Sequence, residues 1–212
     1  MIKAVIFDYD DTLVQTMKSA WKGIKESGKR YYNLEITEEQ IKKYWGRAYK
    51  EMLTGVFNNI DTFENLNTHY EDARKSFPME TYPGALRTIN DLLEKFKIGI
   101  VTASGRKLVI DDLTKLEFPV DKFFYIQTSE DTEFHKPDPR VFDPTLNKLK
   151  SIGVDKNELA YVGDSVNDYF ACRDAGIKFY GIAHGGTSTK EEFQKEGTEV
   201  IDKLADLINL LK

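Results

Sequence analysis

The chain has 212 residues, of which 41% are hydrophobic and 31% charged, and its formal net charge at pH 7 is −5. A single cysteine, Cys172, excludes a disulfide framework and any multi-cysteine metal site, and an acidic balance without a basic block argues against a nucleic-acid partner. No apolar run approaches the ~18 residues of a membrane span, and the N-terminus does not resemble a signal peptide, so we expect a cytoplasmic protein with no membrane partner.

The first element is a buried strand, because Ile2–Phe7 is a short apolar run that leads into the acidic segment Asp8–Thr12. From residue 15 to residue 79 the pattern is helical. Thr37–Gln40 is typical of a capping box. The block is too long for an ordinary connection between strands, so we expect an inserted helical domain. Its clearest helix begins near Asp61 and places five side chains on one face: Phe63, Leu66, Tyr70, Ala73 and Phe77.

After Tyr82-Pro83-Gly84, helices and strands alternate, which indicates βαβ units and a parallel sheet. We predict an α/β fold with a Rossmann-like doubly wound parallel sheet. Residues 1–14 and 80–212 would form this core, and residues 15–79 an inserted all-helical domain. The further predicted strands are Lys97–Thr102, Phe123–Gln127, Leu159–Val162 and Lys178–Ala183, and the predicted helices lie near residues 85–96, 108–116, 146–149, 169–175 and 203–211.

Polar side chains follow four of the predicted strands. In a doubly wound sheet, ligands bind at the carboxyl ends of the strands, so these side chains should converge on one place. They are Asp8 and Asp10 after the first strand, Thr102 and Ser104 at the end of the second, Lys136 after the third, and Asp164 and Asp168 after the fourth.

Four carboxylates in one place need a counter-charge, since two of them ~4 Å apart repel by about 4 kcal/mol at an effective dielectric constant of 20. Oxygen ligands with room for water favour magnesium. A metal ion together with a lysine and a hydroxyl group forms a site suited to a phosphoryl group. A carboxylate in such a site is a nucleophile towards phosphorus, through an aspartyl-phosphate intermediate.

Four motifs resemble those of the haloacid dehalogenase superfamily and come in the same order: Asp8-x-Asp10-x-Thr12, Thr102, Lys136 and Gly163-Asp164-x-x-x-Asp168. The helical insertion after the first motif is similar to the phosphatase subfamily with a helical cap. That subfamily includes the phosphoglycolate phosphatase-like and β-phosphoglucomutase-like proteins. The resemblance covers nearly the whole chain, and it implies a haloacid dehalogenase-like core with a cap at residues 15–79.

The resemblance implies that Asp8 attacks phosphorus and that Asp10 acts as general acid and then as general base. Thr102 and nearby backbone amides would hold the phosphoryl oxygens. Lys136 would screen the nucleophile and the transferring group.

Mg²⁺ is the implied cofactor. It would bind the Asp8 carboxylate, the Asp10 main-chain carbonyl and Asp164, with Asp168 as a ligand or as a support for one. The candidate substrate-binding residues are Thr12, Thr102, Ala103, Lys136 and, in the cap, Arg47.

The implied function is a phosphatase for a small phosphorylated metabolite: phosphoglycolate, a sugar phosphate, a nucleotide or pyrophosphate. A phosphomutase of the β-phosphoglucomutase type and a catalytically silent phosphate-binding module are the alternatives. Asp11 stands where many members have glycine, which bears on substrate class, whereas Asp10 favours phosphate ester hydrolysis. Ser104 is an alternative to Thr102 as the phosphate-binding residue. We expect a monomer or a weak homodimer.

The remaining reactive residues have simpler interpretations. His69, His135 and His184 are scattered and are expected in loops or on the surface. Cys172 is expected to pack inside a helix. Gly185-Gly186 is interpreted as a plain turn, with close approach to a phosphate as the alternative.

Overall fold

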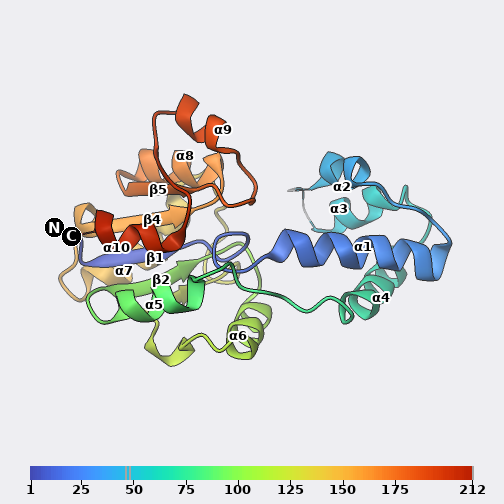
Figure 1. Cartoon of the computed structure of the whole chain (residues 1–212), viewed down its shortest axis with the longest axis horizontal. Coiled ribbons are helices and arrows are strands. Elements are labelled where there is room, and N and C mark those ends of the chain that lie inside the picture. Colours follow the sequence, from blue (N-terminus) through green and yellow to red (C-terminus); the bar gives the residue numbers. More distant parts are fainter. Residues whose placement is uncertain (46, 48, 212) are drawn as a thin grey trace. The chain divides into compact units, whose positions relative to one another are not determined.

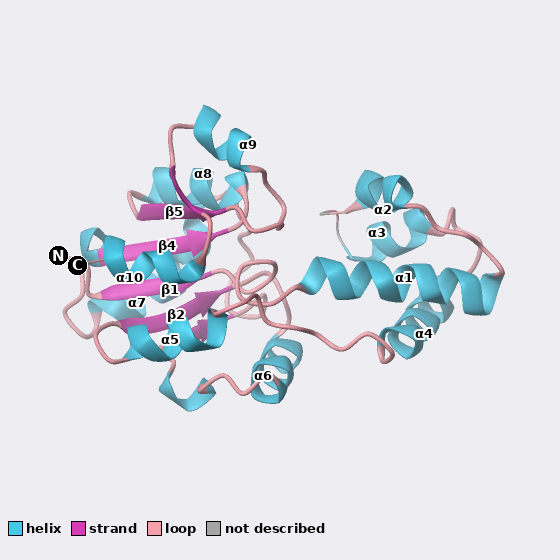
Figure 2. Cartoon of the chain, viewed as in Figure 1, coloured by secondary structure: helices cyan, strands magenta, loops and turns pink. Residues whose placement is uncertain are grey.

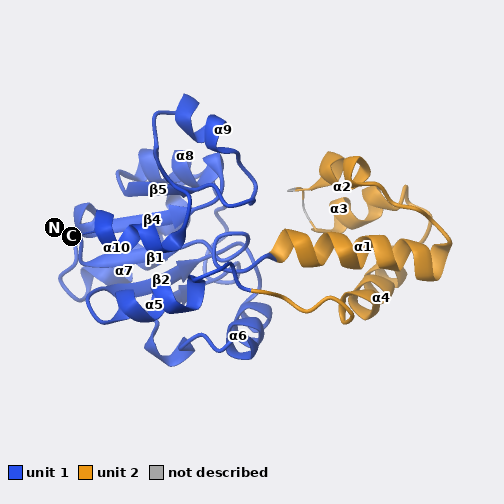
Figure 3. Cartoon of the chain, viewed as in Figure 1, with its two compact units in different colours: residues 1–15, 81–212 blue, residues 16–80 orange. Residues whose placement is uncertain are grey.

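The computed structural model describes residues 1–45, 47 and 49–211, which form two compact units (Figure 3). Unit 1 comprises Met1–Gln15 and Thr81–Lys212, and unit 2 comprises Thr16–Glu80. Unit 1 is an α/β structure and unit 2 is helical. The structure thus confirms the predicted fold class of an α/β core with a helical insertion.

Unit 1 is built on a six-stranded parallel sheet in the order β3-β2-β1-β4-β5-β6 (Figures 1 and 2). The strand order reverses at β1, so the carboxyl ends of β1 and β4 flank the crevice where doubly wound sheets bind ligands. The strands are β1 (Ala4–Phe7), β2 (Lys97–Val101), β3 (Tyr125–Gln127), β4 (Leu159–Gly163), β5 (Lys178–Ile182) and β6 (Glu199–Ile201).

Helices cover both faces of the sheet, which explains why every residue of β1 and β4 is buried. Helices α5 (Ala85–Leu93) and α10 (Leu207–Leu210) lie on one face, and α7 (Asp143–Lys150) and α8 (Val166–Ala175) on the other (Figure 1). The remaining elements are α6 (Arg106–Lys115), α9 (Lys190–Lys195) and the 3₁₀ turns η1 (Val120–Lys122), η2 (Pro139–Phe142), η3 (Lys156–Glu158) and η4 (Leu204–Asp206).

The described residues of unit 2 form four helices: α1 (Thr16–Tyr32), α2 (Glu38–Tyr44), α3 (Tyr49–Val56) and α4 (Phe63–Arg74). The predicted capping box begins α2, where the Thr37 side chain accepts a hydrogen bond from the Gln40 N–H. Helix α1 packs against α4. The unit has an apolar core of its own, with Ile24, Leu53 and Leu66 fully buried in it.

Several elements differ from the predictions. Helix α9 was not predicted, and α4 ends at Arg74, so Phe77 lies outside the helix on which it was expected. The sixth strand, β6, was missed because it is only three residues long and lies at the sheet edge, where one face is partly exposed and no apolar run develops. The closing helix, predicted over residues 203–211, is instead the 3₁₀ turn η4 followed by the short helix α10. No helix in the described part of the chain is long and apolar enough to span a membrane.

Candidate active site

The loop after β1 carries two of the predicted acids. The Asp8 N–H donates to the Val162 carbonyl of β4 at 2.8 Å, so strand pairing continues as far as Asp8. The φ angle of Asp11 is 53°, in the left-handed region, and its N–H donates to the Val14 carbonyl at 2.8 Å. The chain therefore turns sharply after Asp10.

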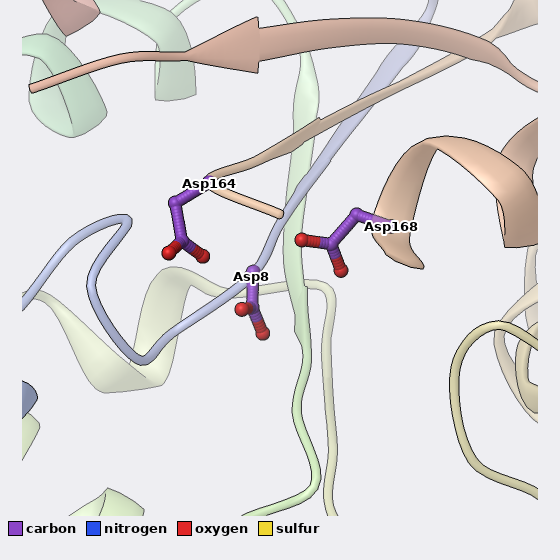
Figure 4. Close-up of side chains that lie close together, drawn as sticks. All are labelled: Asp8, Asp164 and Asp168. Carbon is purple, nitrogen blue, oxygen red and sulfur yellow. The ribbon is translucent and has the colours of Figure 1, made fainter. Parts of the chain in front are cut away.

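Three buried carboxylates converge at the carboxyl ends of β1 and β4 (Figure 4). One carboxylate oxygen each from Asp8, Asp164 and Asp168 lies within 4.8 Å of the other two. Asp168 stands in the first turn of α8, where its Oδ2 accepts the Ser165 N–H at 3.1 Å. A Cβ at Gly163 would lie 2.5 Å from that oxygen, so only glycine lets Asp168 approach the strand.

Burial makes the ionised state of this carboxylate triad unfavourable. It raises the pKa of Asp8 well above the ordinary value, and the charges of Asp168 and Asp164 add to the rise. Burial and the charge of Asp168 also raise the pKa of Asp164 to about 6. A hard divalent cation would neutralise the buried, mutually repelling charges of the triad. Carboxylate oxygens are also the donors that such a cation prefers. The triad can therefore hold a metal ion.

Lys136 is the one cation in contact with the triad among the described residues. Its Nζ lies 2.9 Å from Asp8 Oδ1 and 2.6 Å from Asp168 Oδ1, and only 12% of the side chain is exposed. Burial alone would lower the pKa of Lys136. The charges of Asp168 and Asp8 outweigh that effect and raise it well above the ordinary value, so the ammonium stays charged.

Asp10 lies in a second network beside the triad. Its Oδ2 accepts hydrogen bonds from the hydroxyls of Ser104 at 2.7 Å and Thr102 at 3.1 Å. The Ser104 N–H in turn donates to Thr102 Oγ1 at 3.0 Å. Both candidate phosphate-binding hydroxyls therefore contact the candidate general acid, and the Asp10 side chain is not a member of the carboxylate triad.

The other predicted substrate-binding residues have different surroundings. The Thr12 hydroxyl is buried and donates to Asp164 Oδ1 at 3.4 Å. Ala103 is exposed in the loop after β2. Arg47, in unit 2, pairs with Glu51 at 2.7 Å and lies 5.0 Å from the centre of the Tyr44 ring. Its sequence neighbours Gly46 and Ala48, part of the same motif, lie outside the described residues.

The loop after β5 belongs to the site, although the sequence pattern did not reveal it. Thr187 donates its N–H to Asp164 Oδ2 at 2.5 Å, and the Ser188 N–H donates to the Asp164 carbonyl at 2.9 Å. A Cβ at Gly186 would lie 2.4 Å from Asp164 Oδ2. The interpretation of Gly185-Gly186 as a plain turn is therefore wrong for Gly186. The available signal was its position directly after a strand that neighbours β4.

His184, in the same loop, holds the turn after Asp10. Its Nε2 lies 3.1 Å from the Asp11 carbonyl, and its ring stacks on Tyr82 with centroids 3.5 Å apart. Burial lowers the pKa of His184 to about 4, so the imidazole is neutral near pH 7 and Nε2 donates to the carbonyl.

The comparisons with known proteins agree with this arrangement. A model of the haloacid dehalogenase-like hydrolase family matches residues 5–182. The chain is 28% identical to pyrophosphatase PpaX of Anoxybacillus flavithermus, over 99% of the chain and 97% of that protein. It is 26% identical to phosphoglycolate phosphatase of Nitrosospira multiformis, over 100% and 96%. A solved hydrolase structure from Pseudomonas syringae is 26% identical, with a TM-score of 0.71 over 99% of this chain and 97% of that one.

Proposed function

The chain belongs to the haloacid dehalogenase-like hydrolase family, and from this premise we propose that it is a magnesium-dependent phosphatase acting on a small phosphorylated metabolite. The observation that carries the proposal is the contact of Lys136 with both Asp8 and Asp168 inside a buried carboxylate triad. Relatives named pyrophosphatase and phosphoglycolate phosphatase, each similar over almost the whole chain, support this substrate class.

In the first half-reaction, Asp8 attacks the phosphorus atom and the bond from phosphorus to the leaving oxygen breaks, which gives an aspartyl phosphate. Asp10 donates a proton to the leaving oxygen. Lys136 screens the negative charge of Asp8 from that of the phosphoryl group. Mg²⁺, held by Asp8 and Asp164 with Asp168 in support, would neutralise charge on the phosphoryl oxygens.

In the second half-reaction, water attacks the phosphorus atom of the aspartyl phosphate and Asp10 accepts a proton from that water. The products are inorganic phosphate and a free Asp8 carboxylate. The hydroxyls of Thr102 and Ser104 hold the Asp10 carboxylate in place between the two proton transfers.

The test is phosphate release from a panel of phosphate esters and pyrophosphate, with Mg²⁺ and with a chelator. We expect turnover of at least one compound with Mg²⁺, none with the chelator, and none by Asp8→Asn. Undiminished turnover in the chelator, or a fully active Asp8→Asn protein, would contradict the mechanism.

The same assay separates the alternatives. A phosphomutase would convert a hexose 1-phosphate to the 6-phosphate with little phosphate release. A silent phosphate-binding module would bind phosphate esters and turn none of them over.

A further inference from the structure

The hydroxyl of Tyr161 completes the surroundings of Lys136. Tyr161 lies in the middle of β4 and is fully buried. Its hydroxyl oxygen is 2.9 Å from Lys136 Nζ and 3.0 Å from the Val101 carbonyl of β2. The hydroxyl of a buried tyrosine usually has a hydrogen-bond partner. Here the partners are a backbone carbonyl and the lysine of the proposed active site.

The direction of these hydrogen bonds is fixed by chemistry. A carbonyl oxygen can only accept, so the Tyr161 hydroxyl proton points to Val101. The hydroxyl oxygen must then accept from Lys136, which has three N–H donors and no acceptor. Its three acceptors are Asp8 Oδ1, Asp168 Oδ1 and the Tyr161 hydroxyl. Every donor of this buried ammonium therefore has one partner.

The Tyr161 ring is itself held rigidly. The Phe142 ring packs edge-on against it with centroids 5.1 Å apart, and the Phe179 ring stacks on it at 6.5 Å. Both phenylalanines belong to the same buried core cluster as Tyr161, and Phe179 stands on the neighbouring strand β5. The hydroxyl position is consequently set by core packing and strand geometry, and it does not depend on the loops around the site.

We propose that Tyr161 is a positioning residue, whose hydroxyl directs the Lys136 ammonium at Asp8 and Asp168. The proposal rests on the proposed phosphatase function for its catalytic consequence. Without the hydroxyl, the ammonium has one unsatisfied donor in a buried site, and it can rotate or shift away from the nucleophile. Phosphoryl transfer should then slow, while ground-state binding of the substrate changes little.

The decisive variant is Tyr161→Phe, which removes one oxygen atom and keeps the ring. We expect kcat to fall by about 10- to 100-fold, the range for one hydrogen bond to a charged group, with KM changed by less than about 3-fold. Tyr180→Phe is the matched control, because Tyr180 is equally buried on the neighbouring strand β5. An unchanged kcat in Tyr161→Phe, or equal losses in both variants, would overturn the proposal.

A second measurement does not depend on activity. In ¹⁵N-labelled protein, the Lys136 ammonium, assigned by its absence from Lys136→Met, should give a slowly exchanging signal that weakens in Tyr161→Phe and persists in Tyr180→Phe. If the wild-type protein turns over no phosphate compound, the proposed function fails and this signal still decides the positioning role. Should Tyr161→Phe not fold, a wild-type Lys136 signal that exchanges as fast as surface lysines would overturn the proposal.

Discussion

In the proposed mechanism, the two half-reactions make opposite demands on Asp10, which would first give a proton and then accept one. We predict that Asp10→Asn slows turnover of esters with poor leaving groups by roughly 10²- to 10⁴-fold, the usual contribution of a general acid. An aryl phosphate, whose leaving oxygen needs less protonation, should lose less in the phosphorylation step.

Single-turnover measurements of the two substrates test this prediction. The reference protein is Asp111→Asn, since Asp111 is an exposed acid of α6 that pairs with Lys107 and contacts no residue of the triad in the described part of the chain. Equal losses on both substrates in the Asp10→Asn protein would argue against Asp10 as the acid.

Asp8 and Asp164 link the stability of the metal-free protein to pH. Their folded-state pKa values are raised, so their buried charges destabilise the fold at pH values above those pKa values. This cost disappears as the pH falls through the folded-state pKa values towards the ordinary ones. Mg²⁺ should therefore stabilise the protein more at about pH 8 than at about pH 5, where protons must leave before it binds.

Thermal unfolding with and without Mg²⁺ at both pH values measures this difference. At about 100 times the Kd, binding adds roughly 2.7 kcal/mol, which raises Tm by about 5–10 °C for a chain of this size. Protonation of the buried His184 destabilises the fold as the pH falls, which is the opposite trend. This change is the same with and without Mg²⁺, so it cancels in the difference between the two Tm values. A shift that is larger at low pH, or that survives in Asp164→Asn, would contradict the metal site.

Sequence reasoning at this scale found the charged residues and missed those that support them. Asp8 and Asp164 stand out because each directly follows an apolar strand, and Lys136 and Asp168 complete motifs in the segments that come after β3 and β4. Tyr161 could not be found this way, because an aromatic residue inside a strand is indistinguishable from ordinary core. The contacts of Thr187 and His184 depend on loop geometry that no spacing rule encodes.

Among the elements, the loop after β5 is the one that restrains Asp164 by close backbone contact. We predict that Gly186→Ala lowers Mg²⁺ affinity by about 10-fold or more, as loss of a group that orients a metal ligand usually does. The added Cβ would lie 2.4 Å from Asp164 Oδ2, so the carboxylate or the loop must move.

Calorimetric titration with Mg²⁺ provides the measurement, and Gly105→Ala is the control. A Cβ at Gly105 meets nothing closer than 3.5 Å, and its φ of −73° suits alanine. If both variants bind Mg²⁺ as the wild type does, the loop after β5 does not restrain Asp164.

The predictability of the elements follows from their burial. The strands β1, β2, β4 and β5 were predicted because two covering helical layers require unbroken apolar runs. A strand at the edge of the sheet is less completely covered, so it does not require an unbroken apolar run. The edge strand β6 carries Glu199 and has too few apolar residues to form a pattern. The segment before α10 forms a 3₁₀ turn. Its apolar residues would fit an α-helix equally well, so the sequence pattern did not distinguish the two.

For the whole molecule, the remaining question is how it distinguishes one phosphate compound from another. In the proposed function, the groups of unit 1 at the site would recognise the metal ion and the phosphoryl group, and a phosphoryl group is common to all candidate substrates. We therefore predict that Arg47 of the cap contacts the rest of the substrate. Its ion pair with Glu51 is exposed and worth about 0.3–0.5 kcal/mol, so the guanidinium is readily released to an anionic partner.

Arg47→Ala should lower kcat/KM for the physiological substrate by about 1–3 kcal/mol, and leave a small aryl phosphate almost unaffected. Arg30→Ala is the matched control, because Arg30 is a cap arginine in exposed pairs with Glu26 and Asp72. Equal losses on both substrates would give Arg47 a role in cap folding. No loss on either would make it an ordinary surface residue.

The points where the chain leaves and re-enters the core lie side by side. Val14 and Thr81 form an antiparallel bridge, the Tyr82 N–H donates to the Leu13 carbonyl at 3.1 Å, and Gln15 Nε2 donates to the Thr81 carbonyl at 2.8 Å. These contacts close the insertion at its base within unit 1, whatever its length.

Because the two ends of the insertion are held together within unit 1, the cap can be exchanged as one segment during evolution. Doubling the length of a closed segment costs only about 0.6 kcal/mol in closure entropy. A gene can therefore lengthen, shorten or replace the stretch encoding residues 16–80 by in-frame recombination while the catalytic sheet keeps its stability. With the predicted role of Arg47 in substrate choice, exchange of the cap would change the substrate range while the residues of the carboxylate triad stay in place.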